Sequence, residues 1–230
     1  MTPGARLGVL GGTFDPVHFG HLDAADAART ALALDEILMV PAHDPPHRPL
    51  DPRGTPYHRF ALAALGIADR PGYRVSDVEL VRPGPSYTAD TLGHLHADGW
   101  RASQLFFILG TDAFAEIASW HAFPALLDMA HFAVIARPGT TVEQATSRVP
   151  TLRSRVCAPG SLTRDPMGPT RIVLVEARTR DVSSTVIRQR LAAGKAIDDL
   201  VPASVARHIL THHLYGAVGN LHGEDDQRER

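Results

Sequence analysis

Short apolar runs alternate with stretches of helical periodicity along most of this 230-residue chain. The run Leu-Phe-Phe-Ile-Leu at Leu105–Leu109 is continuous, which is typical of a parallel strand covered on both faces. Between such runs, apolar residues recur at helical spacing, as in Phe19–Leu34. This alternation predicts an α/β protein with a doubly wound, mostly parallel sheet, whose ligands bind at the carboxyl ends of the strands.

The alternation also sets the expected order of elements. The predicted strands are residues 7–10, 36–41, 74–80, 105–109, 132–136 and 171–176. The predicted helices are residues 19–34, 57–68, 88–97, 112–120, 123–130, 184–193 and 202–214. The segment 138–170 has weak periodicity, and we expect it to contain a loop excursion.

Composition limits the class of protein. Hydrophobic residues make up 44% and charged residues 21%, which excludes a chain that is disordered throughout. No linker separates two cores, so we expect one domain over 1–222, with C-terminal helices at about 184–216. Residues 223–230 hold six charges in eight and predict a disordered tail. The net charge of −2 lacks the basic excess of a nucleic-acid-binding protein.

The single cysteine, Cys157, excludes an internal disulfide framework and a cysteine-rich zinc site. The N-terminus lacks a signal-peptide pattern, and no apolar run reaches the ~18 residues that a membrane span needs. We therefore expect a soluble cytoplasmic protein without a membrane partner. The thirteen histidines are a large stock of groups that titrate near neutral pH.

The first chemical motif is Gly11–His21, GGTFDPVHFGH, which connects the first strand to the first helix. Gly11 and Gly12 let the backbone approach a ligand closely. His18 and His21 are three residues apart at the helix start, so both can face one point. Unpaired N–H groups and the helix dipole favour an anion there. The string therefore predicts a polyphosphate site.

Three alternatives to a polyphosphate site fit this motif less well. Two histidines at this spacing could bind a metal ion, but no third ligand at a suitable spacing is evident. The glycines do not form G-x-G-x-x-G, and no phosphate-loop lysine follows them. Simple turn chemistry explains the Gly-Gly and Asp-Pro pairs, but it does not explain two histidines that flank a glycine.

The second motif is Asp181–Arg188, DVSSTVIR, between the last predicted strand and a helix. Ser183 or Ser184 can cap this helix, and apolar residues at the capping-box position leave the helix end open to an outside anion. Arg188 lies one turn after Ser184 on the same side. Taken alone, the stretch also fits an ordinary capped helix with a surface arginine.

Four further stretches carry polar or aromatic side chains at predicted loops or strand ends. They are Pro45–Arg48, Ser86–Leu92, Gly110–Asp112 with Trp120 and His121 following it, and Arg137–Gly139. Each is weak by itself, because a turn, a helix cap, a core tryptophan or a solvated strand end would account for it.

Together these motifs resemble those of known enzymes. The first is similar to the (H/T)xGH signature of the nucleotidyltransferase superfamily, and the second to its ISSTxIR signature, with Val182 at the Ile position. From about Leu7 to Leu191, their order resembles the bacterial nicotinate-nucleotide adenylyltransferase family, which implies a Rossmann-like nucleotidyltransferase fold. The chain departs from that family at Asp44, where asparagine is expected, and in a longer 138–170 segment.

The resemblance implies roles for individual residues. Those expected to hold the ATP phosphates and act in catalysis are His18, His21, Ser184 and Arg188. Those expected to bind substrates are Gly11, Gly12, Thr13, Phe14, Asp44, His47, Arg48, Ser86, Tyr87, Thr88, Gly110, Asp112, Trp120, His121, Arg137, Ser183 and Thr185. Within this set, Asp112 would accept the adenosine ribose hydroxyls and Trp120 would stack on the pyridine ring. Thr88, with backbone amides near His121, would receive the nicotinate carboxylate.

The reaction implied by the resemblance is transfer of AMP from ATP to nicotinate mononucleotide, which gives nicotinate adenine dinucleotide and pyrophosphate. Mg²⁺ would be held mainly by phosphate oxygens, without a protein metal site. Nicotinamide mononucleotide or another phosphate ester is the nearest alternative acceptor, and a non-catalytic nucleotide-binding regulator is an alternative of another class. A redox Rossmann enzyme is more distant, and the oligomeric state, including a homo-oligomer, stays open.

Overall fold

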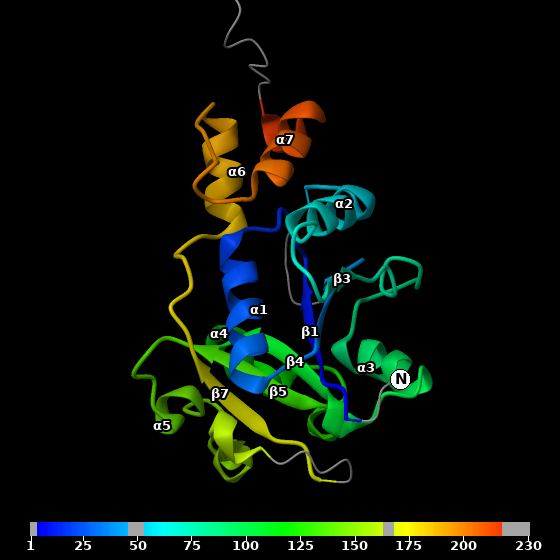
Figure 1. Ribbon diagram of the computed structural model, residues 1–230, viewed down its shortest axis with the longest axis vertical. Coiled ribbons are helices and arrows are strands. Elements are labelled where there is room, and N and C mark those ends of the chain that lie inside the picture. Colours follow the sequence, from blue (N-terminus) through cyan, green and yellow to red (C-terminus); the bar gives the residue numbers. More distant parts are fainter. Residues whose placement is uncertain (1–3, 46–52, 163–167, 218–230) are drawn as a thin grey trace, which may run out of the picture.

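The computed structural model describes residues 4–45, 53–162 and 168–217, and in this part of the chain seven strands form one sheet (Figure 1). The strands are β1 Leu7–Gly12, β2 Glu36–Pro41, β3 Tyr73–Val75, β4 Leu105–Gly110, β5 His131–Ala136, β6 Val156–Cys157 and β7 Ile172–Glu176. Their order is β3-β2-β1-β4-β5-β7-β6, and every pairing is parallel. The predicted α/β class and parallel sheet are confirmed.

The described residues also form seven α-helices and several short 3₁₀ turns. The helices are α1 Phe19–Leu32, α2 Pro56–Gly66, α3 Thr88–Ala97, α4 Thr111–Ala115, α5 Val142–Ala145, α6 Ser184–Ala192 and α7 Ala203–Thr211. The 3₁₀ turns are η1 Ala102–Gln104, η2 Ile117–Ser119, η3 Ala125–Asp128, η4 Pro150–Arg155, η5 Pro159–Ser161 and η6 Leu214–Gly216. Of these elements, α6, α7 and η6 follow the last strand. β2 and α3 begin and end at the predicted residues.

The sheet is covered on both faces, as the continuous apolar strands predict. Alternate residues of β4 illustrate this, because Phe106 and Ile108 belong to one buried cluster and Phe107 and Leu109 to the other. The first cluster includes residues of α1, α2, α6 and α7, and the second includes residues of α3, α4 and the 3₁₀ turns. Two hydrophobic layers therefore hold one sheet between them. Figure 1 shows the sheet with the helices around it.

The order of strands reverses between β1 and β4, since β2 and β3 extend the sheet on one side and β5, β7 and β6 extend it on the other. The ladder between β1 and β4 joins Leu7–Val9 to Leu105–Phe107, whereas all six residues of β1 pair with β2. The carboxyl ends of β1 and β4 are thus unpaired with each other. This is the switch point at which open α/β sheets bind ligands.

Two predicted elements are shorter than expected. The strand predicted at 74–80 ends at Val75, because the chain then turns, with the N–H of Leu80 bonded to the carbonyl of Asp77 (2.7 Å). The helix predicted at 112–120 breaks after Ala115. Ser119 Oγ donates to the carbonyl of Glu116 (2.7 Å), and the chain continues as a 3₁₀ turn.

Two further predictions about secondary structure need correction. The helix predicted at 123–130 is the short 3₁₀ turn η3. The described residues of the segment 138–170, expected to contain a loop excursion, form α5, η4, β6 and η5. Cys157 therefore lies in a strand, paired with Val173, and β6 lies at the edge of the sheet beyond β7. The predicted tail at 223–230 lies outside the described residues. Among the helices described, none has the length and apolar character to span a membrane.

Candidate active site

A cavity of about 500 Å³ opens at the switch point. Its walls come from the ends of β1, β4 and β5, the start of α1, the segments before and within α3, and the chain after β7. The predicted site residues that line it are Gly11, Gly12, Thr13, His18, His21, Ser86, Thr88, Gly110, Asp112, Trp120 and Arg137. Pro45 and Val182 also line it, so the structure brings residues from both motifs and from all four further stretches to one cavity.

The two histidines of the first motif stack at the start of α1. Their ring centroids are 3.7 Å apart with an interplanar angle of 26°. The backbone N–H of His18 donates to Nδ1 of His21 (3.3 Å), which fixes the second ring against the helix end. Both rings line the cavity at a point where helix N–H groups favour anions.

His18 is kept neutral by its surroundings. His18 is only 6% exposed, and burial lowers the pKa of its imidazole from 6.5 to about 4. Its Nδ1 atom is buried and has no hydrogen-bond partner among the described residues. A buried polar atom without a partner is costly, so a ligand at this wall of the cavity would gain by supplying one.

Gly20 makes the close packing of the histidines possible. A Cβ atom at this position would lie 3.1 Å from Nδ1 of His18 and 3.2 Å from Cγ1 of Val182. Contacts this short are rare, so a larger residue would displace the His18 ring or the second motif. The glycine between the two histidines is therefore required by packing.

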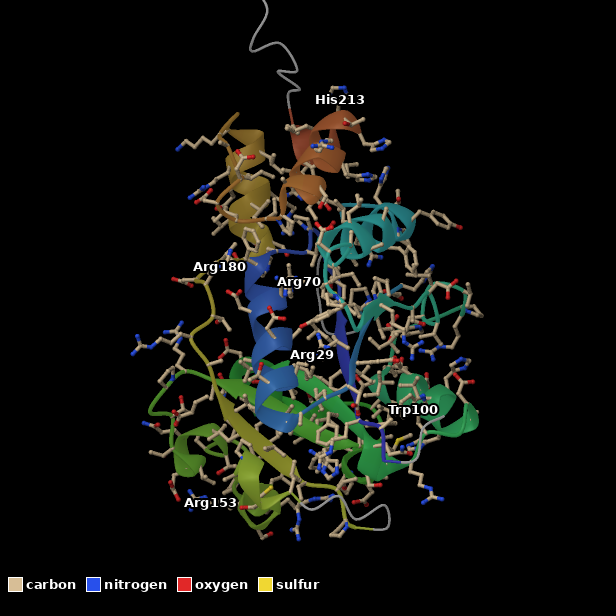
Figure 2. All side chains as sticks on the ribbon, viewed as in Figure 1. Arg29, Arg70, Trp100, Arg153, Arg180 and His213 are labelled. Atoms are coloured by element: carbon tan, nitrogen blue, oxygen red, sulfur yellow. The ribbon has the colours of Figure 1, made fainter. Side chains whose placement is uncertain are left out.

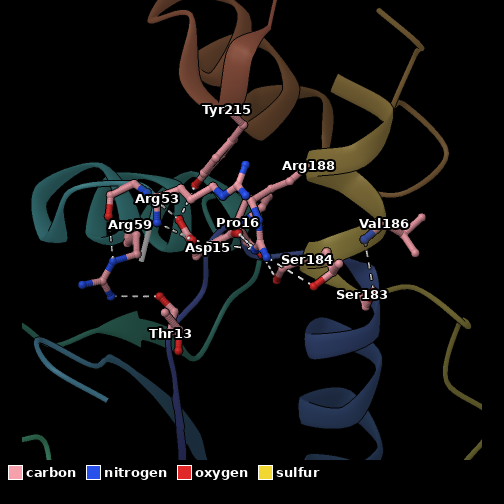
Figure 3. A network of polar contacts seen from close by, with 12 residues as sticks. Thr13, Asp15, Pro16, Arg53, Arg59, Ser183, Ser184, Val186, Arg188 and Tyr215 are labelled. Carbon is pink, nitrogen blue, oxygen red and sulfur yellow. Dashed lines mark hydrogen bonds and ion pairs between the residues drawn. The ribbon is translucent and has the colours of Figure 1, made fainter. Parts of the chain in front are cut away.

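Three side chains donate hydrogen bonds to backbone carbonyls of the turn from β1 to α1 (Figure 3). Arg59 donates to the carbonyl of Thr13 (2.9 Å), Arg188 to that of Asp15 (2.7 Å), and Ser184 to that of Pro16 (2.9 Å). Within this turn, Phe14 adopts a φ of 49°, which is uncommon for a residue with a side chain. Its buried ring contacts that of His21 edge-on, with centroids 5.1 Å apart.

Arg59 was not singled out by the sequence. It is fully buried in α2 and also donates to the carbonyls of Gly54, Ala42 and His43, so it holds the loop after β2 against the first motif. Burial lowers the pKa of its guanidinium, and the Asp15 carboxylate opposes this effect. The available signal was an arginine on the apolar face of an otherwise hydrophobic helix.

The second motif meets the first through direct contacts. Ser183, one of the two serines that the sequence offers as a cap, caps α6 by accepting the N–H of Val186 (3.3 Å). Nη2 of Arg188 donates to Oγ1 of Thr185 (3.2 Å), while Ser184 and Arg188 hold the turn of the first motif. The described residues that line the cavity do not include Ser183, Ser184, Thr185 or Arg188. They stand next to the cavity wall formed by the first motif.

Another wall of the cavity carries aromatic side chains and a hydroxyl group. Trp120 lines it and contacts Phe107 edge-on, with centroids 5.9 Å apart. Thr88 starts α3 at this wall, and the rings of Tyr87 and His121 stack beside it, with centroids 4.4 Å apart. These aromatic side chains come from two connections that lie far apart in the sequence.

The loop after β2 is joined to this wall. Ser86 Oγ accepts the backbone N–H of His43 (2.9 Å), and the N–H of Ser86 donates to the carbonyl of Asp44 (2.8 Å). The side chain of Asp44 is exposed, and the residue is not among those that line the cavity. His47 and Arg48, which follow in this loop, lie outside the described residues.

Glu79 is a cavity residue that the sequence did not reveal. It is buried, and Thr91 Oγ1 donates to its carboxylate. Burial raises the pKa of Glu79, while hydrogen bonds from Thr91 and Ser86 oppose the rise. The turn after β3 brings Glu79 here, so the incorrect prediction of a longer strand concealed its position.

The chain after β7 supplies the remaining wall. Thr179 and Arg180, the latter labelled in Figure 2, line the cavity. The guanidinium of Arg180 lies 3.8 Å from the ring centroid of Phe19. Arg180 also forms an ion pair with Asp23 of α1 (3.3 Å). Across the cavity, Asp112 and Arg137 are exposed at the ends of β4 and β5. Among the described residues, no group of three or more His, Cys, Asp or Glu side chains is arranged to hold a metal ion.

The fold and the site together define a class. A parallel sheet whose switch point carries a stacked His-x-Gly-His pair at a helix start, beside a Ser-Ser-Thr helix, has the architecture of an α/β nucleotidyltransferase. In agreement, the model of the cytidylyltransferase-like family matches residues 9–190.

Similar proteins narrow the class. The chain is 43% identical over 212 residues to a probable nicotinate-nucleotide adenylyltransferase of Chromohalobacter salexigens, covering 92% of this chain and 96% of that one. It is 40% identical over 211 residues to a protein of the same description from Roseiflexus sp. (strain RS-1), covering 92% and 98%. The chain belongs to the nicotinate-nucleotide adenylyltransferase family.

A solved structure agrees with the fold. The nicotinic acid mononucleotide adenylyltransferase of Plasmodium falciparum, complexed with NaAD, superposes with a TM-score of 0.69 at 19% identity. The superposition covers 95% of this chain and 100% of that one. At this identity, the likeness concerns the fold.

Proposed function

We propose that this protein transfers AMP from ATP to nicotinate mononucleotide, giving nicotinate adenine dinucleotide and pyrophosphate. The observation that carries the proposal is one cavity with a histidine-lined helix start on one wall and Trp120 with Thr88 on another. An oxygen of the mononucleotide phosphate attacks the α-phosphorus of ATP. The bond from the α-phosphorus to the bridging oxygen breaks, and pyrophosphate leaves.

The mononucleotide phosphate is already an anionic nucleophile at neutral pH, so the reaction needs no protein base. Catalysis then rests on in-line alignment and on stabilising the charge that develops on pyrophosphate. His18 and His21 donate hydrogen bonds to the phosphates from the start of α1. Ser184 and Arg188 act at the adjoining turn, where a planar guanidinium suits phosphate oxygens.

The two nucleosides occupy different parts of the cavity in this proposal. Trp120 stacks on the pyridine ring, and Thr88 binds the substituent of that ring together with backbone amides near His121. Asp112, exposed at the end of β4, accepts the ribose hydroxyls of the adenosine. Gly11 and Gly12 let the phosphates lie close to the backbone.

Magnesium enters as part of the substrate, the Mg²⁺ complex of ATP. The cavity wall offers single carboxylates, Asp112 and Glu79, in place of a carboxylate cluster. This donor set fits a metal ion that keeps waters and is held mainly by phosphate oxygens.

The direct test is product formation by the full chain with MgATP and nicotinate mononucleotide. We expect stoichiometric nicotinate adenine dinucleotide and pyrophosphate, resolved by chromatography and a coupled pyrophosphate assay. Absence of both products with every mononucleotide tested would contradict the proposal and favour a nucleotide-binding regulator.

One observation bears on a second acceptor, nicotinamide mononucleotide. The buried Glu79 carboxyl lines the same cavity as Thr88, and an ionised carboxylate there would repel the nicotinate carboxylate more than an uncharged amide. A comparison of kcat/KM for the two mononucleotides decides between them. We expect the acid to be preferred, and a higher value for the amide would transfer the proposal to that acceptor.

A further inference from the structure

The carboxylate of Asp15, within the first motif, is buried and has donors from three separate parts of the chain. The backbone N–H groups of Arg53 and Gly54 donate to its two oxygens at 2.9 Å and 2.8 Å. The hydroxyl of Tyr215 donates to Oδ1 at 2.9 Å (Figure 3). Nη1 of Arg188 lies 3.7 Å from Oδ2 as an ion pair. Asp15 thus joins the loop before α2, the second motif and the C-terminal turn η6.

This carboxylate bears directly on the orientation of Arg188. Nη1 of Arg188 donates to the backbone carbonyl of Asp15 (2.7 Å), and Nη2 donates to Thr185 (3.2 Å). The guanidinium carries five N–H donors, so these two bonds fix its plane and leave further donors for an anion. A change at the Asp15 carboxylate would therefore shift a side chain expected to meet phosphate.

Tyr215 is suited to hold that carboxylate in place. Its hydroxyl comes from η6, which packs against α6, and the residue adopts a φ of 60°. Burial, followed by the nearby Asp15 charge, raises the pKa of Tyr215 above its ordinary value, so the phenol stays a donor. Space beside it is tight, because a Cβ at Gly54 would lie 2.8 Å from both the Tyr215 hydroxyl and Asp15 Oδ1.

We infer that Tyr215 is a positioning residue for phosphate binding, which acts through Asp15 to orient Arg188. The inference rests on the proposed function, in which Arg188 meets the ATP phosphates. The hydroxyl of Tyr215, near the C-terminal end of the described residues, then belongs to a phosphate-binding site that the two motifs otherwise form.

The test is Tyr215→Phe, which removes only the hydroxyl. We expect the Kd for magnesium pyrophosphate, measured by calorimetry on the full chain, to rise about five- to tenfold, or about 1 to 1.4 kcal/mol. The KM for the mononucleotide should stay within twofold. In an Arg188→Lys background the same substitution should have little further effect, because the two side chains act in series.

The matched control is Tyr73→Phe. Tyr73 also donates to an aspartate, Asp26, with Arg70 on the same carboxylate, but this cluster joins β3 to α1 away from the cavity. Equal effects of both substitutions on pyrophosphate affinity, or additive effects of Tyr215→Phe and Arg188→Lys, would overturn the inference. Pyrophosphate binding by a wild type that makes no dinucleotide would refute the proposed function and leave this test valid.

Discussion

His18 and His131 lie at opposite ends of the same parallel sheet and have nearly the same acid–base behaviour. His18 follows β1 at the carboxyl end, whereas His131 begins β5 at the amino end. Both are buried, and burial lowers the pKa of each to about 4. Titration alone therefore does not separate a site residue from a core residue.

Their partners do separate them. His131 stacks on Phe106 with centroids 4.6 Å apart, and its Nδ1 accepts the N–H of Arg171 (3.0 Å). The Nδ1 of His18 has no such partner among the described residues, and its ring lines a cavity beside His21. An unsatisfied polar atom at a cavity wall thus identifies a functional histidine better than a shifted pKa does.

The largest expected difference between the two ends is in catalysis. His21→Ala should lower kcat about 100- to 1,000-fold, the usual cost of removing a donor to developing charge. The comparison variant at the amino end is His131→Asn, which should leave kcat within about twofold in the fraction that stays folded. Initial rates of pyrophosphate release at saturating substrates measure both. A His21→Ala enzyme within a few-fold of wild type would break the distinction.

The two tryptophans extend the comparison to substrate binding. Trp120 lines the cavity, whereas Trp100 precedes β4 at the amino end and packs against the second cluster (Figure 2). Trp120→Ala should raise the KM for the mononucleotide about tenfold, or about 1.4 kcal/mol, because a stacking face is lost. Trp100→Ala should lower stability and leave that KM nearly unchanged. Equal KM values for the two variants would show that Trp120 is only a core residue.

A smaller effect is expected from crowding the His18 ring. Gly20→Ala adds a Cβ 3.1 Å from Nδ1 of His18, so kcat should fall about five- to tenfold through displacement of the ring. Gly93→Ala is the matched control within a helix, since its nearest neighbour would be Met129 Cε at 3.9 Å. Steady-state kinetics at saturating ATP compares them, and equal kcat values would exclude a positional requirement at His18.

The two histidines should not differ in how they make folding stability depend on pH. Because each histidine has a folded pKa below its unfolded value, the unfolded chain binds protons first, and stability falls as pH drops from about 6.5 towards 4. Replacing either histidine with glutamine should remove on the order of 2 to 3 kcal/mol of that loss. Urea unfolding at pH 7 and pH 4.5 measures the change. A loss confined to one of the two would contradict their shared burial.

The sequence could predict what local pattern determines. Apolar runs and helical periodicity predicted the parallel sheet, β2 and α3, because strand and helix signals lie within each segment. Predictions were wrong where short-range hydrogen bonds form a turn in place of the expected element, as the bonds of Leu80 and Ser119 do after β3 and α4. Within the excursion, β6 was missed because its two residues form a strand only by pairing with β7.

The residues of the site also fall into those that local motifs predict and those that only the structure reveals. His18, His21 and Trp120 were identifiable from motifs, and the structure places them at one cavity. Arg59 and Tyr215 were not, because their acceptors in the first motif lie 46 and 200 residues away in sequence. Which distant side chain ties back a given carbonyl or carboxylate depends on tertiary packing, and no local pattern records it.

The most direct measurement is a titration of ¹⁵N-histidine-labelled protein with magnesium pyrophosphate, followed by imidazole ¹⁵N chemical shifts. We expect large changes at His18 and His21, with the pKa of His18 rising as phosphate charge approaches it, and no change at His131. Unchanged His18 resonances at saturating pyrophosphate, or equal changes at His131, would contradict the placement of phosphate at the carboxyl end of the sheet.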